Sequence, residues 1–248
     1  GVAWDTGIAA YRLYLDRRNG LDAFGKRVST PALGRHGYDN ESYHDVGDWG
    51  ADILHVGESL GIGSPGVWRG GKARRIDGEQ GIAARIIDNG PYFARFVVES
   101  KGWKPGEGDR IDVASTYSVL AGSRPTHVSV VASRAVEGWV TGFIRNPAAS
   151  AIVSNDGQEW QYLASWGRQS MFNDEMGLAV FYRRADAVPS NQDKESHMIL
   201  FNGSRPHVDY FLSAVWSRDT QGIDSREKFV AYLERERKWL SSGGAGAF

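Results

Sequence analysis

Short runs in which apolar and polar residues alternate are the dominant pattern along this chain of 248 residues. A period of two places successive side chains on opposite faces of a β-strand. The predicted strands are residues 11–15, 92–98, 111–120, 127–131, 139–144, 160–166, 178–182, 198–201 and 208–215. So many short strands, with little helical pattern between them, predict a large antiparallel β-sandwich or barrel.

One hairpin turn and one helix complete the predicted framework. The sequence Ala121-Gly122-Ser123 separates two strands, which we expect to pair. Near the end, Asp224 is a good helix N-cap with Glu227 three residues later. The apolar stripe of this helix is Phe229, Tyr232, Leu233 and Leu240, and its polar face is Glu234 to Lys238. We expect residues 1–240 to form a single β-sandwich domain with the helix across one end, followed by a flexible tail at 241–248.

Composition excludes several functional classes. The chain has 29 basic and 30 acidic residues, so no excess of positive charge exists to attract nucleic acid or an anionic membrane. It has no cysteine, which excludes disulfides, thiolate nucleophiles and cysteine-ligated metals. No apolar run approaches the roughly 20 residues of a membrane helix. The motifs of serine hydrolases, zincins, P-loop kinases and nicotinamide dehydrogenases are also missing from the sequence.

The segment from Gly34 to Gly63 follows neither the strand nor the helix period. It is rich in glycine and crowded with polar and aromatic side chains, and long connections of this kind are commonly functional or disordered. Tyr38, Tyr43 and Trp49 argue against disorder, because such side chains are normally buried or used in binding. We therefore predict that the stretch from His36 to His55 forms one wall of a carbohydrate cleft.

His44, Asp48 and Asp52 are the first candidate constellation in this stretch. If the stretch is partly helical, they share one face at positions i, i+4 and i+8. An imidazole beside carboxylates suits general base catalysis, and the same groups could ligate a divalent cation. The alternative is that the aspartates cap turns and His44 is structural. Because no recognised ligand spacing is present, we predict no metal or other cofactor, although calcium at Asp39–Glu41 stays open.

Two further pairs of residues are candidates for chemistry. Alternation places His207 and Tyr210 on opposite faces of a predicted strand, where they could serve as base and acid near a cleft, or fill structural roles. Trp68 and Arg69 begin a tight hairpin at Gly70-Gly71. The arginine fork matches a sugar carboxylate and the indole can stack on a sugar ring, although an ordinary solvated hairpin fits equally well.

A family resemblance rests on the run from Tyr43 to Leu54, with Ala3-Trp4-Asp5 and Tyr11-Arg12-Leu13-Tyr14 before it. These residues, together with 121–123 and 207–216, resemble a bacterial family of secreted proteins catalogued as domain of unknown function 4861. The resemblance covers nearly the whole chain. It brings no established catalytic residues, so the candidate site residues rest on the local patterns above.

The resemblance implies a galactose-mutarotase-like or polysaccharide-lyase β-supersandwich, encoded near enzymes that degrade pectin-type polysaccharides. It also implies export to the periplasm or outside the cell. The family normally carries a signal peptide and more N-terminal sequence than this chain, which begins at Gly1 without a signal peptide. If N-terminal strands are missing, an exposed sheet edge would invite a partner chain or a homo-oligomer.

We therefore expect an enzyme that acts on uronate-containing saccharides, first of all a β-eliminating lyase. A cationic group would neutralise the uronate carboxylate, a base would remove the C5 proton, and an acid would protonate the leaving oxygen. The catalytic candidates are Tyr43, His44, Asp48, His207 and Tyr210. The substrate-binding candidates are Arg12, His36, Trp49, Asp52, Trp68 and Arg69. The alternatives are a glycoside hydrolase that uses Asp48 and Asp52, a sugar epimerase, or a carbohydrate-binding protein without chemistry.

Overall fold

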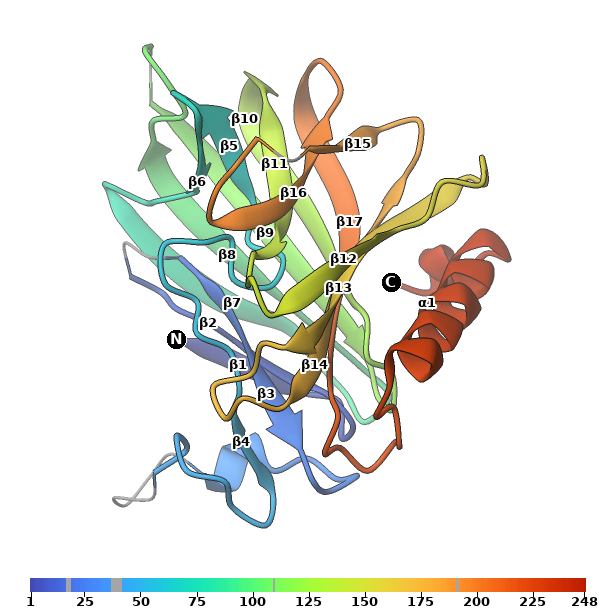
Figure 1. Cartoon of the computed structure of the whole chain (residues 1–248). Coiled ribbons are helices and arrows are strands. Elements are labelled where there is room, and N and C mark those ends of the chain that lie inside the picture. Colours follow the sequence, from blue (N-terminus) through green and yellow to red (C-terminus); the bar gives the residue numbers. More distant parts are fainter. Residues whose placement is uncertain (17–18, 37–41, 109, 191) are drawn as a thin grey trace.

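Three antiparallel sheets and one long helix make up the structure, a computed structural model that describes residues 1–16, 19–36, 42–108, 110–190 and 192–248 (Figure 1). The four-stranded sheet has the order β1 (Val2–Asp5), β2 (Ala10–Leu13), β3 (Leu21–Lys26), β4 (Gly50–Asp52). The eight-stranded sheet has the order β12 (Ala149–Val153), β13 (Trp160–Arg168), β14 (Glu175–Arg183), β17 (Ser204–Trp216), β10 (Thr126–Glu137), β9 (Ile111–Leu120), β8 (Phe93–Trp103), β7 (Gly81–Asn89). The five-stranded sheet has the order β15 (Ala187–Ser190), β16 (Ser196–Phe201), β11 (Trp139–Ile144), β5 (Gly66–Arg69), β6 (Lys72–Arg75).

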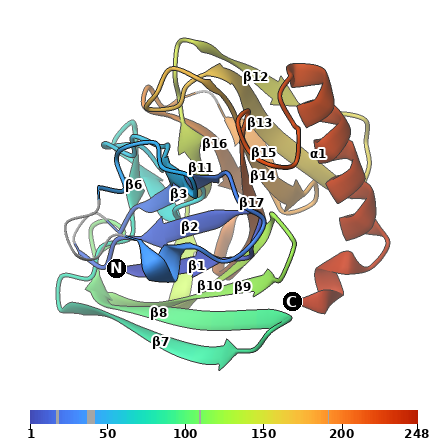
Figure 2. The same cartoon turned by 90° about the horizontal axis from the view of Figure 1, so that it is seen from below.

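The two smaller sheets pack on one face of the eight-stranded sheet, here called its inner face. Trp4 of β1 lies with its ring centroid 5.0 Å from Phe96 and 5.6 Å from Tyr117. Trp139 of β11 lies 5.3 Å from Trp103 of β8. These contacts join the three sheets into one continuous apolar core, and Figure 2 shows β1 and β2 lying over β8 and β7.

Helix α1 (Arg226–Ser241) covers the outer face of the eight-stranded sheet over β13 and β14 (Figure 2). Phe229 of the helix packs on Trp166 at a centroid distance of 5.3 Å. After the helix, the 3₁₀ turn η2 (Gly244–Ala247) brings Phe248 to 5.2 Å from Phe211 of β17. A second 3₁₀ turn, η1 (Leu33–Arg35), precedes the predicted cleft segment.

The strand pattern of the sequence is confirmed. Each of the nine predicted strands is present, most of them longer than predicted. The hairpin about Ala121-Gly122-Ser123 is confirmed as well, because β9 and β10 pair with Ser118 opposite His127. The Gly70-Gly71 turn between β5 and β6 has positive φ at both residues, as a two-residue hairpin of type I′ requires.

The helix is confirmed with two corrections. Its N-cap is Ser225, whose side chain accepts a hydrogen bond from the Lys228 amide, whereas the Asp224 carboxylate pairs with the Lys228 ammonium at 2.8 Å. Arg237, assigned to the polar face, is buried because its guanidinium binds Asp156 and Glu234. No helix among the described residues is long and apolar enough to cross a membrane.

Candidate active site

The candidate site is built on one face of the four-stranded sheet. In the β2–β3 pairing Arg12 lies opposite Asp22, and in the β3–β4 pairing Phe24 lies opposite Asp52. Asp22 and Phe24 are two residues apart on β3, so all four side chains share one face of the sheet. Tyr14, two residues beyond Arg12, is brought to the same face, and its amide donates to the Gly20 carbonyl at 3.1 Å. Strand register thus assembles a charged cluster from segments 40 residues apart.

One guanidinium holds two carboxylates in this cluster. Arg12 Nη2 donates to Asp22 Oδ2 at 2.8 Å and to Asp52 Oδ2 at 3.2 Å. The Tyr14 hydroxyl donates to Asp22 Oδ2 at 2.9 Å. The guanidinium also lies 4.4 Å from the centroid of the Tyr14 ring and 5.0 Å from that of Tyr43. Arg12 is therefore fixed by the protein itself, through two charge-assisted hydrogen bonds and two aromatic rings.

The two carboxylates differ from ordinary aspartates in their affinity for a proton. Burial raises the pKa of Asp22 above its usual range, although Arg12 and Tyr14 act against this rise. Burial, followed by the negative charge of Asp22, raises the pKa of Asp52 to about 7, despite Arg12. A single guanidinium cannot compensate two desolvated carboxylates, so the cluster keeps a proton that an exposed aspartate would lose. The same surroundings raise the pKa of the Tyr14 phenol, by burial first and then by the charge of Asp22.

Asp52 and Tyr14 reach a cavity of about 310 Å³. The cavity is lined by Tyr14, His44, Asp52, Leu54, His55, Val56, Gly57, Glu58 and Met171. His44 Nδ1 lies 3.6 Å from Asp52 Oδ2, and its side chain is 56% exposed, so this imidazole stands between the buried carboxyl and solvent. Asp22 does not line the cavity, because its side chain is 1% exposed beneath Arg12 and Tyr14. The cavity thus presents two carboxyls, two imidazoles and the Tyr14 phenol to a bound molecule, and of the two carboxyls only Asp52 is buried.

The backbone of the 42–54 segment positions His44 over Asp52. The Asp52 amide donates to the Tyr43 carbonyl at 2.8 Å, which closes the segment into a compact loop. The Tyr43 ring lies 4.3 Å from the His44 ring and 6.2 Å from Phe24. The predicted helical face of His44, Asp48 and Asp52 does not form, because residues 42–49 are turns and Asp52 ends β4. His44 and Asp52 meet through this loop closure instead.

Four predicted site residues come together here, and three others of the same segment do not join them. Arg12, Tyr43, His44 and Asp52 belong to the cluster or its loop. Asp48 is exposed in the turn before β4, so it does not orient His44. Trp49 is 5% exposed, and His36 stacks on it at 4.7 Å. Both rings therefore have a structural role, and the Trp49 indole has no open face on which a sugar could stack. Tyr38 and the Asp39–Glu41 run lie outside the described residues.

Trp68 and Arg69 lie elsewhere, in the β5–β6 hairpin. Arg69 is half-buried and donates to the carbonyls of Trp68 at 3.0 Å and Glu137 at 2.8 Å. Its fork is therefore engaged by the backbone. Arg69 lines a different cavity, of about 570 Å³, together with Trp103. Neither residue lines the cavity at Asp52.

Tyr210 and His207 point to opposite faces of β17, as predicted. Tyr210 is fully buried on the inner face, where its hydroxyl donates to the Gly63 carbonyl at 2.6 Å and burial raises its pKa well above the usual value. It can donate to no substrate from there. His207 lies on the outer face, with Nε2 2.5 Å from Asp209 Oδ2 and 3.0 Å from Ser129 Oγ. Because one nitrogen meets both groups, these residues do not form a serine–histidine–aspartate relay.

The sequence reasoning missed Tyr14 and Asp22. Tyr14 carried a signal, since it lies two residues after Arg12 in a predicted strand and so shares its face. Asp22 carried none, because its role depends on the β2–β3 register. Among the described residues, no group of three histidine, aspartate or glutamate side chains is arranged to hold a metal ion.

Comparison with known proteins gives one assignment. The family model described as a domain of unknown function (DUF4861) matches residues 1–243. A search of curated proteins found no match. Since the family model spans nearly the entire chain, this protein belongs to the DUF4861 family.

Proposed function

We propose that this protein is a carbohydrate-active enzyme that cleaves uronate-containing saccharides by β-elimination at the cavity beside Asp52. The observation that carries the proposal is Asp52 itself, a buried carboxyl whose pKa is raised to about 7 and which lies 3.6 Å from the accessible imidazole of His44. Strongly shifted carboxyls at the wall of a cavity are typical of acid–base sites.

The mechanism assigns one task to each group at the cavity. Protonated Asp52 donates a hydrogen bond to the uronate carboxylate, which lowers the charge on that group and acidifies the C5 proton. His44 takes the C5 proton, the C5–H electrons form the C4=C5 double bond, and the C4–O bond breaks. Tyr14 turns its hydroxyl from Asp22 and gives its proton to the leaving oxygen. Solvent then carries a proton from His44 back to Tyr14, which restores both groups. Arg12 positions the two carboxyls and does not contact the substrate.

Two alternatives fit the geometry less well. A glycoside hydrolase needs two carboxyls on either side of the scissile bond, roughly 5–10 Å apart. Asp48 is exposed in a turn and Asp22 is covered. The other carboxyl at the cavity, Glu58, is 79% exposed and pairs with Lys72 at 3.5 Å, so it lacks the burial that sets Asp52 apart. A protein that only binds sugars needs hydrogen-bonding groups and aromatic faces, but it does not need a carboxyl that titrates near neutral pH, as Asp52 does.

The family resemblance supports the choice of substrate and the setting. On that basis we propose that the eight-stranded sheet and its two smaller partners form a galactose-mutarotase-like supersandwich, and that the protein works in the periplasm or outside the cell. The partner we propose is the saccharide. A second protein chain, if one binds, would pair with β1, which is an edge strand of the four-stranded sheet.

A panel of uronate oligosaccharides tests the proposal. β-Elimination creates a conjugated double bond that absorbs in the near ultraviolet, so absorbance should rise together with new reducing ends. We expect Asp52→Ala and His44→Ala to lower turnover by about 10²-fold or more. Asp48→Asn is the matched control, since it removes a carboxylate from the same segment outside the cavity, and it should keep full activity. Turnover of the wild type should fall above about pH 7, where Asp52 loses its proton.

Three results would contradict the proposal. They are new reducing ends without absorbance, which would indicate hydrolysis, absence of turnover on the whole panel, and full activity in both cavity variants.

A further inference from the structure

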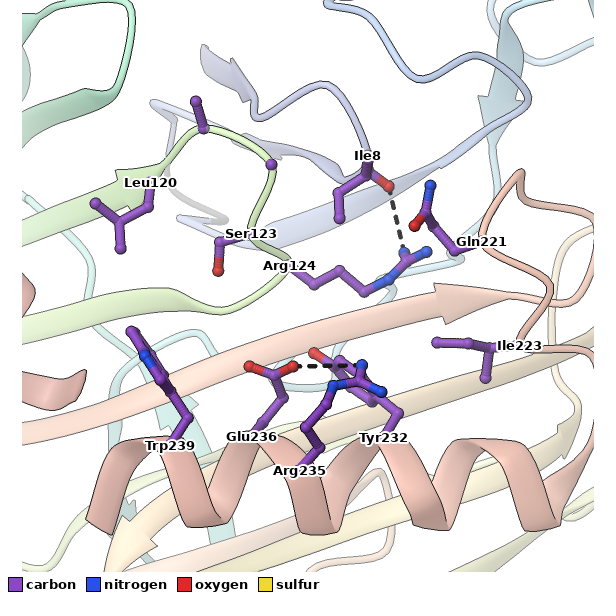
Figure 3. Close-up of a pocket in the computed structure, with 12 residues that line it drawn as sticks. Ile8, Leu120, Ser123, Arg124, Gln221, Ile223, Tyr232, Arg235, Glu236 and Trp239 are labelled. Carbon is purple, nitrogen blue, oxygen red and sulfur yellow. Dashed lines mark hydrogen bonds and ion pairs between the residues drawn. The ribbon is translucent and has the colours of Figure 1, made fainter. Parts of the chain in front are cut away.

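A second cavity, of about 600 Å³, lies beside α1 (Figure 3). Four segments form its walls: the β1–β2 turn at Ile8, the β9–β10 turn at residues 120–124, the loop at Gln221 and Ile223, and α1 from Tyr232 to Trp239. It shares no lining residue with the cavity at Asp52. Its volume is in the range of small-molecule sites, about 300–1,000 Å³.

A fixed indole closes one end of this cavity. Trp239 stands beside the β9–β10 turn in Figure 3. Gly244 packs against its ring so closely that an added Cβ would come within 2.3 Å of the indole, and Phe248 meets it edge-on at 5.9 Å. Neither Gly244 nor Phe248 lines the cavity, so they hold the ring from outside. A rigid indole wall offers an apolar surface at little entropic cost.

The polar side chains of the cavity provide both acceptors and donors. The Glu236 side chain is 16% exposed, and its carboxylate lies 3.6 Å from the guanidinium of Arg235, beyond ordinary hydrogen-bond distance. Arg235 is itself 67% exposed and lies over the Tyr232 ring at 5.4 Å, which places its donors at the cavity edge. Across the cavity, Ser123 directs its hydroxyl toward the helix (Figure 3). The carboxylate is thus half-buried with the Arg235 ion pair beside it, and at 3.6 Å this pair leaves its oxygens room to accept from a ligand hydroxyl.

We propose that this cavity is a second saccharide-binding site, which takes one end of a sugar chain independently of the cavity at Asp52. A pyranose ring presents an apolar C–H face and a rim of hydroxyls that donate and accept. Trp239 complements the face, Glu236 accepts from the hydroxyls, and Arg235 donates to them. The site goes beyond the proposed lyase activity, because binding here requires no chemistry.

Binding of two trisaccharides to the full chain tests this site, with trigalacturonate as the acidic probe and galactotriose as the neutral one. Isothermal titration gives the dissociation constant, and chemical-shift changes at the Trp239 indole N–H locate the site. We expect Glu236→Gln and Trp239→Leu to weaken binding about tenfold or more. Arg226→Gln, on the exposed first turn of α1, is the matched control and should leave binding unchanged.

The two sites are separated by a second control. Asp52→Ala should lower turnover by about 10²-fold or more and keep binding at the α1 cavity, so failure of the lyase proposal and failure of this one give different results. If Trp239→Leu does not fold, Glu236→Gln and Arg235→Gln carry the test. Binding of only the acidic or only the neutral probe supports the site and defines its ligand. Absence of binding by both trisaccharides, or binding that all cavity variants retain, overturns it.

Discussion

Asp52 and Asp209 both lie beside histidines, but their surroundings shift their pKa values in opposite directions. Asp52 shares the single guanidinium of Arg12 with Asp22, so burial and its neighbour's charge raise its pKa to about 7. Burial acts on Asp209 in the same direction, but the hydrogen bond from His127 at 2.8 Å and the charge of His207 outweigh it and lower its pKa. The ratio of positive partners to carboxylates decides which effect dominates.

This difference separates a site for chemistry from a site for structure. Asp52 can gain or lose a proton near neutral pH and lies at a cavity, which suits proton transfer. Asp209 stays an anion and holds two imidazoles on the outer face of the eight-stranded sheet. A histidine beside an aspartate therefore does not by itself identify an active site. A cluster with more buried carboxylates than cations is a better indicator, because one of its carboxyls can exchange a proton near neutral pH.

The largest effect on stability should come from removing the shared cation. Arg12→Met leaves Asp22 and Asp52 buried without a positive partner, and we expect a loss of about 3–5 kcal/mol in the free energy of unfolding at pH 8. Urea denaturation measures it. Adding Asp22→Asn should restore part of the loss, because a single carboxylate is easier to neutralise by protonation. A loss below about 1 kcal/mol would show that Arg12 does not compensate the pair.

The pH dependence of stability should have opposite signs at the two aspartates. Folded Asp52 holds its proton up to about pH 7 and the unfolded chain only to about 3.8, so stability falls as pH rises through this window. Asp209 has a lowered pKa, so its contribution is present above about pH 3.8 and is lost as pH falls further. Asp52→Asn should flatten the first slope and Asp209→Asn the second in urea midpoints measured across pH. Unchanged slopes would contradict the shifts.

The smallest effect in this series should come from Tyr210, which the sequence offered as a catalytic acid. Tyr210→Phe removes the hydrogen bond to the Gly63 carbonyl and leaves that buried acceptor unsatisfied, at a cost of about 1–2 kcal/mol. Turnover should stay unchanged after correction for folded fraction. A loss of turnover in the folded fraction of Tyr210→Phe would show that Tyr210 is catalytic, and it would contradict the location of the active site at Asp52.

The sequence predicted the fold better than it predicted the site. Strands such as β9 and β11 were located to the residue, because alternation and glycine turns are local properties. Short strands such as β4, with three residues, have too little pattern to be seen. The N-cap was placed one residue early, since Asp224 and Ser225 are both good capping residues.

The sequence predicted only part of the site. Several of its residues lie in one short segment and could be chosen from it, but their contacts depend on segments that are distant in the sequence. His44 and Asp52 were chosen from a crowded loop, and their contact follows from loop closure at Tyr43 and not from a helix. The role of Asp22 and the raised pKa of Asp52 depend on which strands are neighbours, and no pattern in the sequence reports that. Distant candidates such as His207 could not be placed without the sheet order.

The most direct test of this account is a carboxyl NMR titration of Asp52. Selective ¹³C labelling of aspartate, with Asp52→Asn to assign the resonance, would follow the carboxyl carbon from pH 3 to pH 9. We expect a midpoint near pH 7 in the wild type and a lower midpoint in Asp22→Asn, where the neighbouring charge is removed. A wild-type midpoint near pH 4, unaffected by Asp22→Asn, would contradict the claim that two buried carboxyls share one arginine here.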